Sequence, residues 1–508
     1  MTITITKRYL VFPVNTLASM KKLHFAINEK SVYQLNIKLD HITPNFHAYL
    51  DVSRYMGQTL TISVVPEMEL HFQMADEMNL PHVYQEPMRP QIHFTTKNGW
   101  INDPNGLIYL DGVYHMFYQH NPAEPNWENM HWGHAESRDL IHWHEKPAVL
   151  FPDHRGTMYS GNAFLDTENA LGKGRNTALL FYTTTTPFCQ HMSYSTDNFK
   201  TVIPFRNAPV VPHIMAENRD PAVVFCQELG CYVMLLYLDR DEYGILTSHN
   251  LADWTEHQRI HLPGDGECPD IFCLQDPAGN RKWVIMGASS KYLVGQFESG
   301  QFIACQPIQS LHYGTAAYAG QSFSNLPGGR VVRMDWDRWG LPADGFNGQM
   351  GIPMELTLDE ENGNYYLQAQ PVAELECLYQ QTDVFQSPTL PFRADLEPSP
   401  YLLKLHGNGT GTLTLTVFGR TIHFDFENNR LTLAGCTAPI SVTGADLDVT
   451  VIVDRCSLEL YADHGRIYAS AVNKESISDY NLPWLTVQSQ GDIALDQIQL
   501  TLLKSIWN

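Results

Sequence analysis

Residues 98–106 read NGWINDPNG, and the apolar run LIYL follows directly. The stretch combines two Asn-Gly pairs with an Asp-Pro pair, and all of these residues favour turns. Pro104 restricts Asp103 to extended backbone conformations and cannot itself donate a hydrogen bond to a neighbouring strand. We therefore expect Asp103 where a turn enters a β-strand, fixed between side-chain amides. An isolated Asp-Pro is usually an ordinary turn, so the rest of the chain must decide its meaning.

Two other acidic residues lie in similar settings further along the chain. Asp220 precedes a proline and an apolar strand in ENRDPAVVF (217–225), and Glu267 follows a glycine in GDGECPDIF (264–272). Each one alone is more simply explained as a turn residue. Together with Asp103 they would supply what a glycosidase needs. One carboxylate attacks or stabilises the sugar, one carboxylic acid protonates the leaving oxygen, and a third binds hydroxyls.

The middle of the chain contains an internal repeat. SRDLIHW at 137–143 is echoed at 195–201 and 248–254, so the copies stand 58 and 53 residues apart. Each copy follows an apolar or aromatic stretch typical of a β-strand. Four short strands with their turns occupy about 40–50 residues, so the spacing fits β-propeller blades with long loops, or another all-β repeat. In a propeller, equivalent blade positions converge on the central axis, which would bring the three carboxyl groups together.

Alternating apolar residues predict strands on both sides of this repeat. In SVYQLNIKLD (31–40) and TLTISVVP (59–66) every second residue is apolar. TLTLTVFGRTIHFDF (412–426) shows the same alternation and reads as a hairpin with Gly419-Arg420 at its turn. Several short strands near the C-terminus are typical of a β-sandwich.

The length of the chain implies more than one domain. A single core stops growing near ~250–300 residues, and this chain has 508. The best short helix is PVAELECLYQQ (371–381), followed by a proline-rich stretch. We expect a small N-terminal β-domain at residues 1–84 and a central repeat domain at 85–369. A linker with the short helix should follow at 370–391, and a C-terminal β-sandwich at 392–508.

Composition narrows the classes of partner and the location. The formal net charge is −22, which disfavours nucleic acid and anionic membrane surfaces, because both require clustered basic residues. A neutral sugar is compatible with this charge. No apolar stretch approaches the ~18 residues of a membrane-spanning segment. The N-terminus lacks the apolar core of a signal peptide, so we expect a cytoplasmic protein.

The cysteines and histidines predict neither a metal site nor a cofactor. The nine cysteines include no Cys-x-x-Cys pair, which argues against a disulfide framework and against a zinc–thiolate site. HWGH (131–134) and HWH (142–144) fit strands with satisfied polar groups better than a set of metal ligands. Motifs for nucleotide binding or for a serine hydrolase are absent. We expect no cofactor and no metal ion.

Several long segments resemble one known family. They are RPQIHFTTKNGWINDPNGLIYLDGVYHMFYQHNP (89–122), WENMHWGHAESRDLIHW (127–143), NRDP (218–221), ECPD (267–270) and VTVIVDRCSLELYADHG (449–465). In this order they closely resemble glycoside hydrolase family 32, which includes invertases, levanases, inulinases and sucrose-6-phosphate hydrolases. The resemblance extends from about residue 88 to residue 508.

The resemblance implies an all-β fold, with a five-bladed β-propeller catalytic domain and a C-terminal β-sandwich, and a retaining mechanism. Matched motif by motif, it implies that Asp103 is the nucleophile, Glu267 the general acid/base and Asp220 the transition-state stabiliser. In a retaining enzyme the carboxyl groups of Asp103 and Glu267 are expected ~5–5.5 Å apart. The resemblance also implies contacts to the fructosyl unit from Asn102, Gln119, Trp127, Ser160 and Arg219.

The N-terminal block bears on the substrate. It resembles the small β-domain that precedes the propeller in some fructan-degrading members, whereas plain sucrose-6-phosphate hydrolases usually lack one. This favours an exo-acting enzyme that releases terminal β-D-fructofuranosyl residues from fructans, fructo-oligosaccharides and sucrose. The alternatives are a sucrose-6-phosphate hydrolase or invertase restricted to small sugars, a fructosyltransferase on the same scaffold and, outside the class, an inactive fructan-binding protein. The two outer domains also offer surfaces for a homo-oligomer.

Overall fold

The computed structural model describes residues 1–339, 345–440, 446–473, 475–477 and 484–507. Within these residues the regular structure is almost entirely β-strand, and the helices are short 3-10 turns such as η3 (Ala373–Leu378). In this part of the chain no helix has the length and apolar character needed to cross a membrane. The expectation of a predominantly β protein is confirmed.

The N-terminal residues up to Ala75 form two small antiparallel sheets around a core of their own. The sheets have the orders β1-β6-β3-β4 and β5-β2-β7, with β1 (Thr2–Thr4), β2 (Tyr9–Val14), β3 (Lys21–Ile27), β4 (Lys30–Ile37), β5 (Phe46–Asp51), β6 (Thr59–Val65) and β7 (Gln73–Ala75). On β6, buried and exposed side chains alternate as predicted. This unit meets the next sheet through Tyr33 on β4, whose hydroxyl lies 2.8 Å from His131 Nε2.

Five antiparallel sheets follow in chain order. Their strands are β8 (Gly99–Leu110), β9 (Val113–Asn121), β10 (His131–Ser137) and β11 (Trp143–Leu150); β12 (Met158–Tyr159), β13 (Ala163–Asp166), β14 (Thr177–Thr185), β15 (Phe188–Ser195) and β16 (Ile203–Pro204); β17 (Arg219–Cys226), β18 (Cys231–Asp239), β19 (Glu242–Ser248) and β20 (Thr255–His261); β21 (Asp270–Gln275), β22 (Arg281–Met286), β23 (Lys291–Glu298), β24 (Gln301–Ala304) and β25 (Gln309–Ser310); and β26 (Ala317–Ser322), β27 (Val331–Asp337), β29 (Gln349–Met350), β30 (Met354–Glu361) and β31 (Asn364–Pro371).

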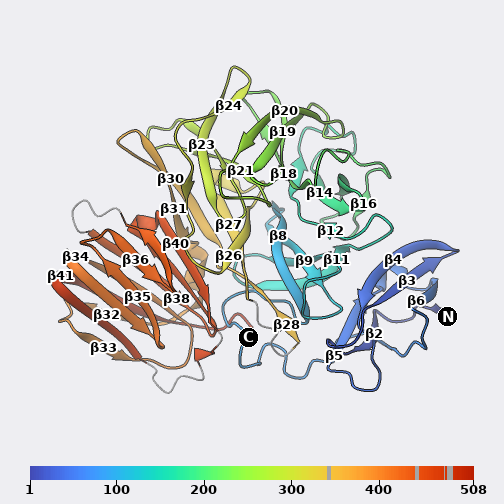
Figure 1. Cartoon of the computed structure of the whole chain (residues 1–508), viewed down its shortest axis with the longest axis horizontal. Coiled ribbons are helices and arrows are strands. Elements are labelled where there is room, and N and C mark those ends of the chain that lie inside the picture. Colours follow the sequence, from blue (N-terminus) through green and yellow to red (C-terminus); the bar gives the residue numbers. More distant parts are fainter. Residues whose placement is uncertain (340–344, 441–445, 474, 478–483, 508) are drawn as a thin grey trace.

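These five sheets close a ring. The inner strands β8, β13, β17, β21 and β26 contact one another in turn, and β26 contacts β8. The closure is hydrogen-bonded, because the Ser324 N–H donates to the Leu107 carbonyl at 2.9 Å and the Tyr109 N–H donates to the Ser324 carbonyl at 3.1 Å. A short strand, β28 (Phe346–Asn347), also pairs with β8 in parallel. In Figure 1 the ring lies between the blue N-terminal sheets and the orange-red C-terminal sheet.

The repeated motif has the same structural place in three of the sheets. Ser137, Ser195 and Ser248 each end the strand that precedes the outermost strand. The hydroxyl of each serine lies 2.9–3.2 Å from the Asp or Asn side chain two residues later. The spacing of the repeat is therefore the spacing of equivalent turns in successive sheets.

The C-terminal part forms a ladder of ten strands around a separate core. Its strands are β32 (Tyr379–Gln386), β33 (Phe392–Asp395), β34 (Tyr401–Val417), β35 (Arg420–Asp425), β36 (Arg430–Leu433), β37 (Cys436–Pro439), β38 (Asp446–Val453), β39 (Ser457–Ala462), β40 (Ile467–Val472) and β41 (Trp484–Leu503). Along its whole length β34 pairs with β41, but its first half also pairs with β38 and its second half with β35.

Two local predictions in this part need correction. The predicted hairpin is β34–β35, but its turn lies at Phe418-Gly419, where both residues have positive φ (45° and 72°), and Arg420 already pairs with Val417. A two-residue turn with positive φ at both positions matches the twist of the two strands that it joins. The predicted helix 371–381 shortens to the 3-10 turn η3, because its last residues pair with β41 as β32. Tertiary pairing overrides the local helical preference there, and a strand occupies part of the expected linker.

A buried ion cluster joins the C-terminal ladder to the ring. His93 Nδ1 lies 2.8 Å from Asp454 Oδ2, and His93 Nε2 lies 3.1 Å from Glu459 Oε1. All three side chains are fully buried. Burial alone would lower the pKa of His93, but the hydrogen bonds to the two carboxylates raise it to about 10. The imidazolium therefore neutralises charge that would otherwise be buried without a partner.

Candidate active site

From Gly99 on, the stretch NGWINDPNG lies inside β8 rather than in a turn before it. The pairing of β8 with β9 shifts register on both sides of Pro104-Asn105. The unpaired residues are Asn102 and Asp103, because Ile101 lies opposite His120 and Pro104 lies opposite Tyr118. The prediction that Asp103 lies where a turn enters a strand is therefore corrected. Asp103 lies at a bulge within a strand, and bulges re-aim side chains beside functional sites.

Asp103 accepts hydrogen bonds on both carboxylate oxygens. The Ser160 hydroxyl donates to Oδ2 at 2.6 Å, and the Asn102 amide donates to Oδ1 at 2.9 Å. Asn102 is held in turn by the Trp100 indole N–H, which donates to its Oδ1 at 2.7 Å. Burial raises the pKa of the Asp103 carboxyl above its ordinary value, while the Ser160 and Asn102 donors oppose this rise. The arrangement orients a partly desolvated carboxylate.

Asp220 occupies a strained backbone position near the start of β17. Its φ is 64°, in the left-handed region, and the pairing of β17 with β18 shifts register beside it. The backbone N–H of Cys268 donates to its Oδ2 at 3.0 Å. Burial raises the pKa of Asp220 to about 7; the Arg219 guanidinium opposes this rise, and two neighbouring carboxylates add to it. Strained positions of this kind cluster at functional sites.

Glu267 lies in the loop before β21, also at a positive φ of 59°. The Arg219 guanidinium donates to its Oε1 at 2.6 Å, and the Tyr318 hydroxyl donates to its Oε2 at 2.8 Å. The two donors come from different sheets of the ring, β17 and β26. The Glu267 side chain is 37% exposed, so a molecule entering from solvent can reach its carboxyl group.

The three carboxyl groups line one cavity of about 360 Å³. All eight site residues predicted from the sequence line this cavity, namely Asn102, Asp103, Gln119, Trp127, Ser160, Arg219, Asp220 and Glu267. The Cys268 thiol links two of the carboxylates, at 3.4 Å from Asp103 Oδ2 and 3.5 Å from Asp220 Oδ2. Burial and the surrounding carboxylates raise the pKa of Cys268 well above its ordinary value, so it remains a thiol. The cavity thus combines carboxyl groups in different settings, as acid–base chemistry requires.

Two nominated residues contribute to the walls rather than to the carboxylate cluster. Gln119 on β9 is buried, and its side-chain amide donates to the Met158 carbonyl at 3.0 Å. Trp127 is 51% exposed, with its ring edge-on to Tyr159 at a centroid distance of 6.1 Å. An exposed indole at the mouth of a polar cavity offers a flat apolar face, which suits the face of a sugar ring.

Comparison with known sequences decides the family. The sequence model described as "Glycosyl hydrolases family 32 N-terminal domain" matches residues 93–371, more than half of the chain. The chain belongs to glycosyl hydrolase family 32. The resemblance drawn from its motifs is confirmed.

Relatives of this family 32 chain include two proteins of Bacillus subtilis (strain 168). A levanase is 28% identical over 498 residues, covering 84% of this chain and 72% of the relative. A levanbiose-producing levanase is 32% identical over 363 residues, which cover 65% of this chain and 68% of that relative. Of two longer relatives the chain spans only 53% and 35%. The structure of a fructofuranosidase from Schwanniomyces occidentalis complexed with fructose is 20% identical, with a TM-score of 0.75 over 84% of this chain and 100% of that one.

Several residues of the family 32 cavity were not nominated from the sequence. They are Met130, Tyr159, Glu217, Cys268, Tyr318 and Trp336. Tyr318 lies 215 residues beyond Asp103, in YGTAAYAGQSF (313–323), which resembles the family's stretch leading into the last blade but does not single out its second tyrosine. Trp336 comes from β27 and packs edge-on against Trp100 at 5.8 Å. Only ring closure brings Tyr318 and Trp336 to β8, so no local signal could have identified these two, whereas Tyr159 and Cys268 each adjoin a residue chosen from the sequence.

Groups of side chains that could ligate a metal lie elsewhere in the family 32 chain. Among the described residues they are His115–His134–Glu136, Asp139–His142–Cys377 and His93–Asp337–Glu459, and none of these residues lines the cavity. In HWGH (131–134), His131 bonds the Tyr33 hydroxyl and the Asn129 carbonyl.

Proposed function

We propose that the chain is a retaining glycoside hydrolase that releases terminal non-reducing β-D-fructofuranosyl residues from fructans, fructo-oligosaccharides and sucrose. The observation that carries this proposal is the convergence of Asp103, Asp220 and Glu267 on one cavity in a family 32 chain. The relatives support the substrate class, because they include levanases, a fructan β-fructosidase and exo-inulinases at 28–32% identity. The closed ring of five sheets is interpreted as a five-bladed β-propeller and the ten-stranded ladder as a β-sandwich.

In the proposed first step, the Asp103 carboxylate attacks the anomeric carbon of the fructosyl unit. At the same time Glu267 gives its proton to the glycosidic oxygen, and the rest of the substrate leaves. The Ser160 hydroxyl and the Cys268 thiol both donate to Oδ2 of Asp103, whereas Oδ1 accepts from Asn102 and keeps a further lone pair for the attack. Asp220, held by the Cys268 N–H, accepts hydrogen bonds from sugar hydroxyls as positive charge develops on the ring.

In the proposed second step, the Glu267 carboxylate takes a proton from water, which attacks the same carbon and frees Asp103. Two inversions give overall retention of configuration. Arg219 and Tyr318 are placed to hold Glu267 through both steps, because each donates to one of its oxygens. The carboxyl groups of Asp103 and Glu267 are predicted to lie ~5–5.5 Å apart in the loaded enzyme.

The charge of the cavity favours a neutral substrate over a phosphorylated one. The lining residues include four carboxyl groups, those of Asp103, Glu217, Asp220 and Glu267, and one guanidinium. That guanidinium, on Arg219, already bonds Glu267 and Glu217. A phosphorylated sugar would meet net negative charge without a free cation to neutralise it. This favours fructans and sucrose over sucrose 6-phosphate.

Chromatography of the products from sucrose, a short inulin-type oligosaccharide and levan tests the proposal. Fructose from all three is expected, and Asp103→Asn should lose about 10³-fold or more in kcat, because the nucleophile is removed. Activity restricted to sucrose or its phosphate would contradict fructan hydrolysis. Longer oligosaccharides at high sucrose would indicate a fructosyltransferase, and binding without turnover would indicate a fructan-binding protein.

A further inference from the structure

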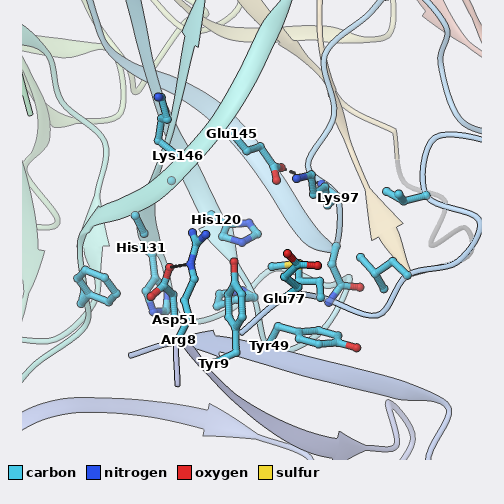
Figure 2. A pocket seen from close by; sticks show the side chains of 18 of the residues that line it. Arg8, Tyr9, Tyr49, Asp51, Glu77, Lys97, His120, His131, Glu145 and Lys146 are labelled. Carbon is cyan, nitrogen blue, oxygen red and sulfur yellow. Dashed lines mark hydrogen bonds and ion pairs between the residues drawn. The ribbon is translucent and has the colours of Figure 1, made fainter. Parts of the chain in front are cut away.

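A second cavity, of about 370 Å³, lies between the N-terminal sheets and the first sheet of the ring. Its walls come from β2 and β5, from the segment that follows β7, and from β9, β10 and β11. Figure 2 shows Tyr9 extending from the N-terminal sheet toward His120 on the ring, with Glu145 and Lys97 above them in the view. The cavity therefore exists only because the N-terminal unit is docked against the ring.

The two cavities of the molecule share strand β9 as a wall. Neighbouring side chains of a strand point to opposite faces. Accordingly, Gln119 lines the cavity of the three carboxyl groups, whereas Tyr118 and His120 line the second cavity. The His120 ring also lies 2.8 Å, through Nδ1, from the Trp100 carbonyl, and Trp100 holds Asn102 beside the catalytic cluster. A ligand in the second cavity would thus sit directly behind the proposed active site.

Several polar groups that line the second cavity are free to bind a ligand. The hydroxyls of Tyr9 and Tyr118 have no hydrogen-bond partner among the residues that the structure describes. His120 Nδ1 is bonded to the Trp100 carbonyl, and within the same described residues its Nε2 has no partner. Glu145 Oε1 accepts from the Lys97 backbone N–H at 2.8 Å, which leaves Oε2 for another donor. These donors and acceptors converge on one cavity and are available to hydrogen-bond a ligand that enters it.

Two of the three lysine and arginine side chains that line the cavity are paired with carboxylates. Arg8 donates to Asp51 at 2.9 Å, and Lys146 lies 2.8 Å from Glu136. His120 is uncharged near neutral pH, because burial lowers its pKa to about 4. Phosphate binding normally uses free guanidinium or ammonium groups. The third basic residue of the lining, Lys97, shares it with four carboxyl groups, those of Asp51, Asp76, Glu77 and Glu145, so the net negative charge disfavours a phosphate. Hydroxyl, imidazole and carboxylate groups remain to bind a polar, uncharged molecule.

Aromatic surface completes the lining. The rings of Tyr9 and Tyr49 lie 6.0 Å apart at 89°, so one presents its face where the other presents its edge. Arg8 covers Tyr9 from a distance of 4.8 Å. Flat rings beside hydrogen-bonding groups suit molecules that have both apolar C–H faces and hydroxyls. Carbohydrates combine these two kinds of surface.

We propose that this cavity is a second binding site for a neutral oligosaccharide, which holds a fructan segment behind the site of hydrolysis. The sugar hydroxyls would bond Tyr9, Tyr118, His120 and Glu145, and a ring would pack on Tyr9 or Tyr49. The choice of a fructan as ligand rests on the proposed function. The N-terminal unit then acts as one half of a binding site and not only as a cover for the ring.

Calorimetric titration with a short inulin-type oligosaccharide tests the proposal. Asp103→Asn is the parent chain, so that the ligand is not consumed, and two binding sites per chain are expected. Adding Tyr118→Phe and Glu145→Gln removes one hydroxyl and one charge with little change of shape, and should weaken one of the two sites at least about tenfold. Tyr232→Phe is the matched control, because Tyr232 on β18 lines neither cavity.

A stoichiometry of one site or none in the parent chain would overturn the proposal, as would two unchanged sites in the combined variant. Melting curves recorded beside the titrations establish that the variants are folded. Failure of the proposed function is seen separately, because it would abolish release of fructose from sucrose by the unmutated chain. Crystals of the parent chain soaked in the same oligosaccharide should show it beside Tyr9 and His120.

Discussion

Asp103 and Asp220 meet the same physical conflict in different ways. Both are taken out of water beside other carboxyl groups, which disfavours their charged forms. At Asp103 two hydrogen-bond donors, Ser160 and Asn102, act directly on the carboxylate. At Asp220 the rise in pKa that burial causes is opposed mainly by the positive charge of Arg219. Because the balance depends on single neighbours, single substitutions should shift it measurably.

Ser160→Ala should move the acid limb of activity to higher pH. The pKa of Asp103 is already raised, so its carboxylate, and with it activity, is lost as the pH falls through that pKa. Removing the Ser160 donor raises the pKa further and lowers kcat/KM about tenfold on the acid side. The pH profile of sucrose hydrolysis measures this. Ser193→Ala, at a buried serine outside the cavity, is the control, and an acid limb that stays in place would contradict the role of Ser160.

Asp220→Asn should stabilise the protein while reducing activity. The pKa of Asp220 is about 7 when folded, above the ~3.9 of an aspartate in water. Stability therefore falls as the pH rises from ~4 to 7, and the full cost of the buried charge is present above 7. The amide carries no charge and can still accept from the Cys268 N–H. Thermal melts at pH 4 and pH 8 should show a gain of a few degrees at pH 8 only; a loss at pH 8 would contradict the account.

At the scale of elements, the chain predicts strands well and irregularities poorly. Alternation on β6 and β34 identifies the buried faces, because one face of each strand meets a core. The bulge in β8 was missed, since NGWINDPNG has the composition of a turn and only pairing with β9 makes it a strand. The same holds for β32, which becomes a strand by pairing with β41. Asp103, Asp220 and Glu267 could still be chosen from the sequence, because each lies in a stretch with the composition of a turn beside an apolar strand.

Gly161→Ala should damage both stability and activity through the element that carries Ser160. A Cβ at Gly161 would lie 2.0 Å from the Phe181 carbonyl oxygen, so the segment between β12 and β13 must move. We expect a loss of ~1–3 kcal/mol in the free energy of unfolding, together with a lower kcat. Denaturant unfolding and sucrose assays measure the two effects. The control is Gly172→Asn, in open space at a positive φ that asparagine tolerates, and equal losses in both variants would contradict the packing argument.

At the scale of the whole molecule, the composition and motif order gave the classes of fold and of partner, but not the contacts between units. The cavity behind β9 combines Tyr9 with Glu145, and the ion cluster combines His93 with Asp454 and Glu459. These groups are 136 to 366 residues apart, and each is unremarkable in its own segment. Their partners are set by how the units dock, which no local pattern encodes.

The His93 cluster predicts how the C-terminal ladder responds to alkaline pH. The pKa of His93 is raised from 6.5 to about 10, so its contribution to stability is complete below pH ~6.5 and is lost as the pH rises through about 10. His93→Gln should lower stability at pH 7 by ~3–5 kcal/mol, because two carboxylates are left buried without a cation, and should flatten the alkaline loss. Melting curves from pH 6 to 11 test this, with exposed His154→Gln as control. An alkaline loss of the same size in His93→Gln would refute the assignment.

The most direct test of the catalytic account is to trap the covalent intermediate. Glu267→Ala should still be fructosylated by an aryl β-D-fructofuranoside, whose leaving group needs no proton, but it should lose water activation in the second step. Mass spectrometry of the digested protein should then find one added fructosyl unit on the peptide that contains Asp103. A fructosyl unit on another residue, or rapid hydrolysis with no adduct on Asp103, would contradict the assignment of Asp103 as nucleophile and Glu267 as acid/base.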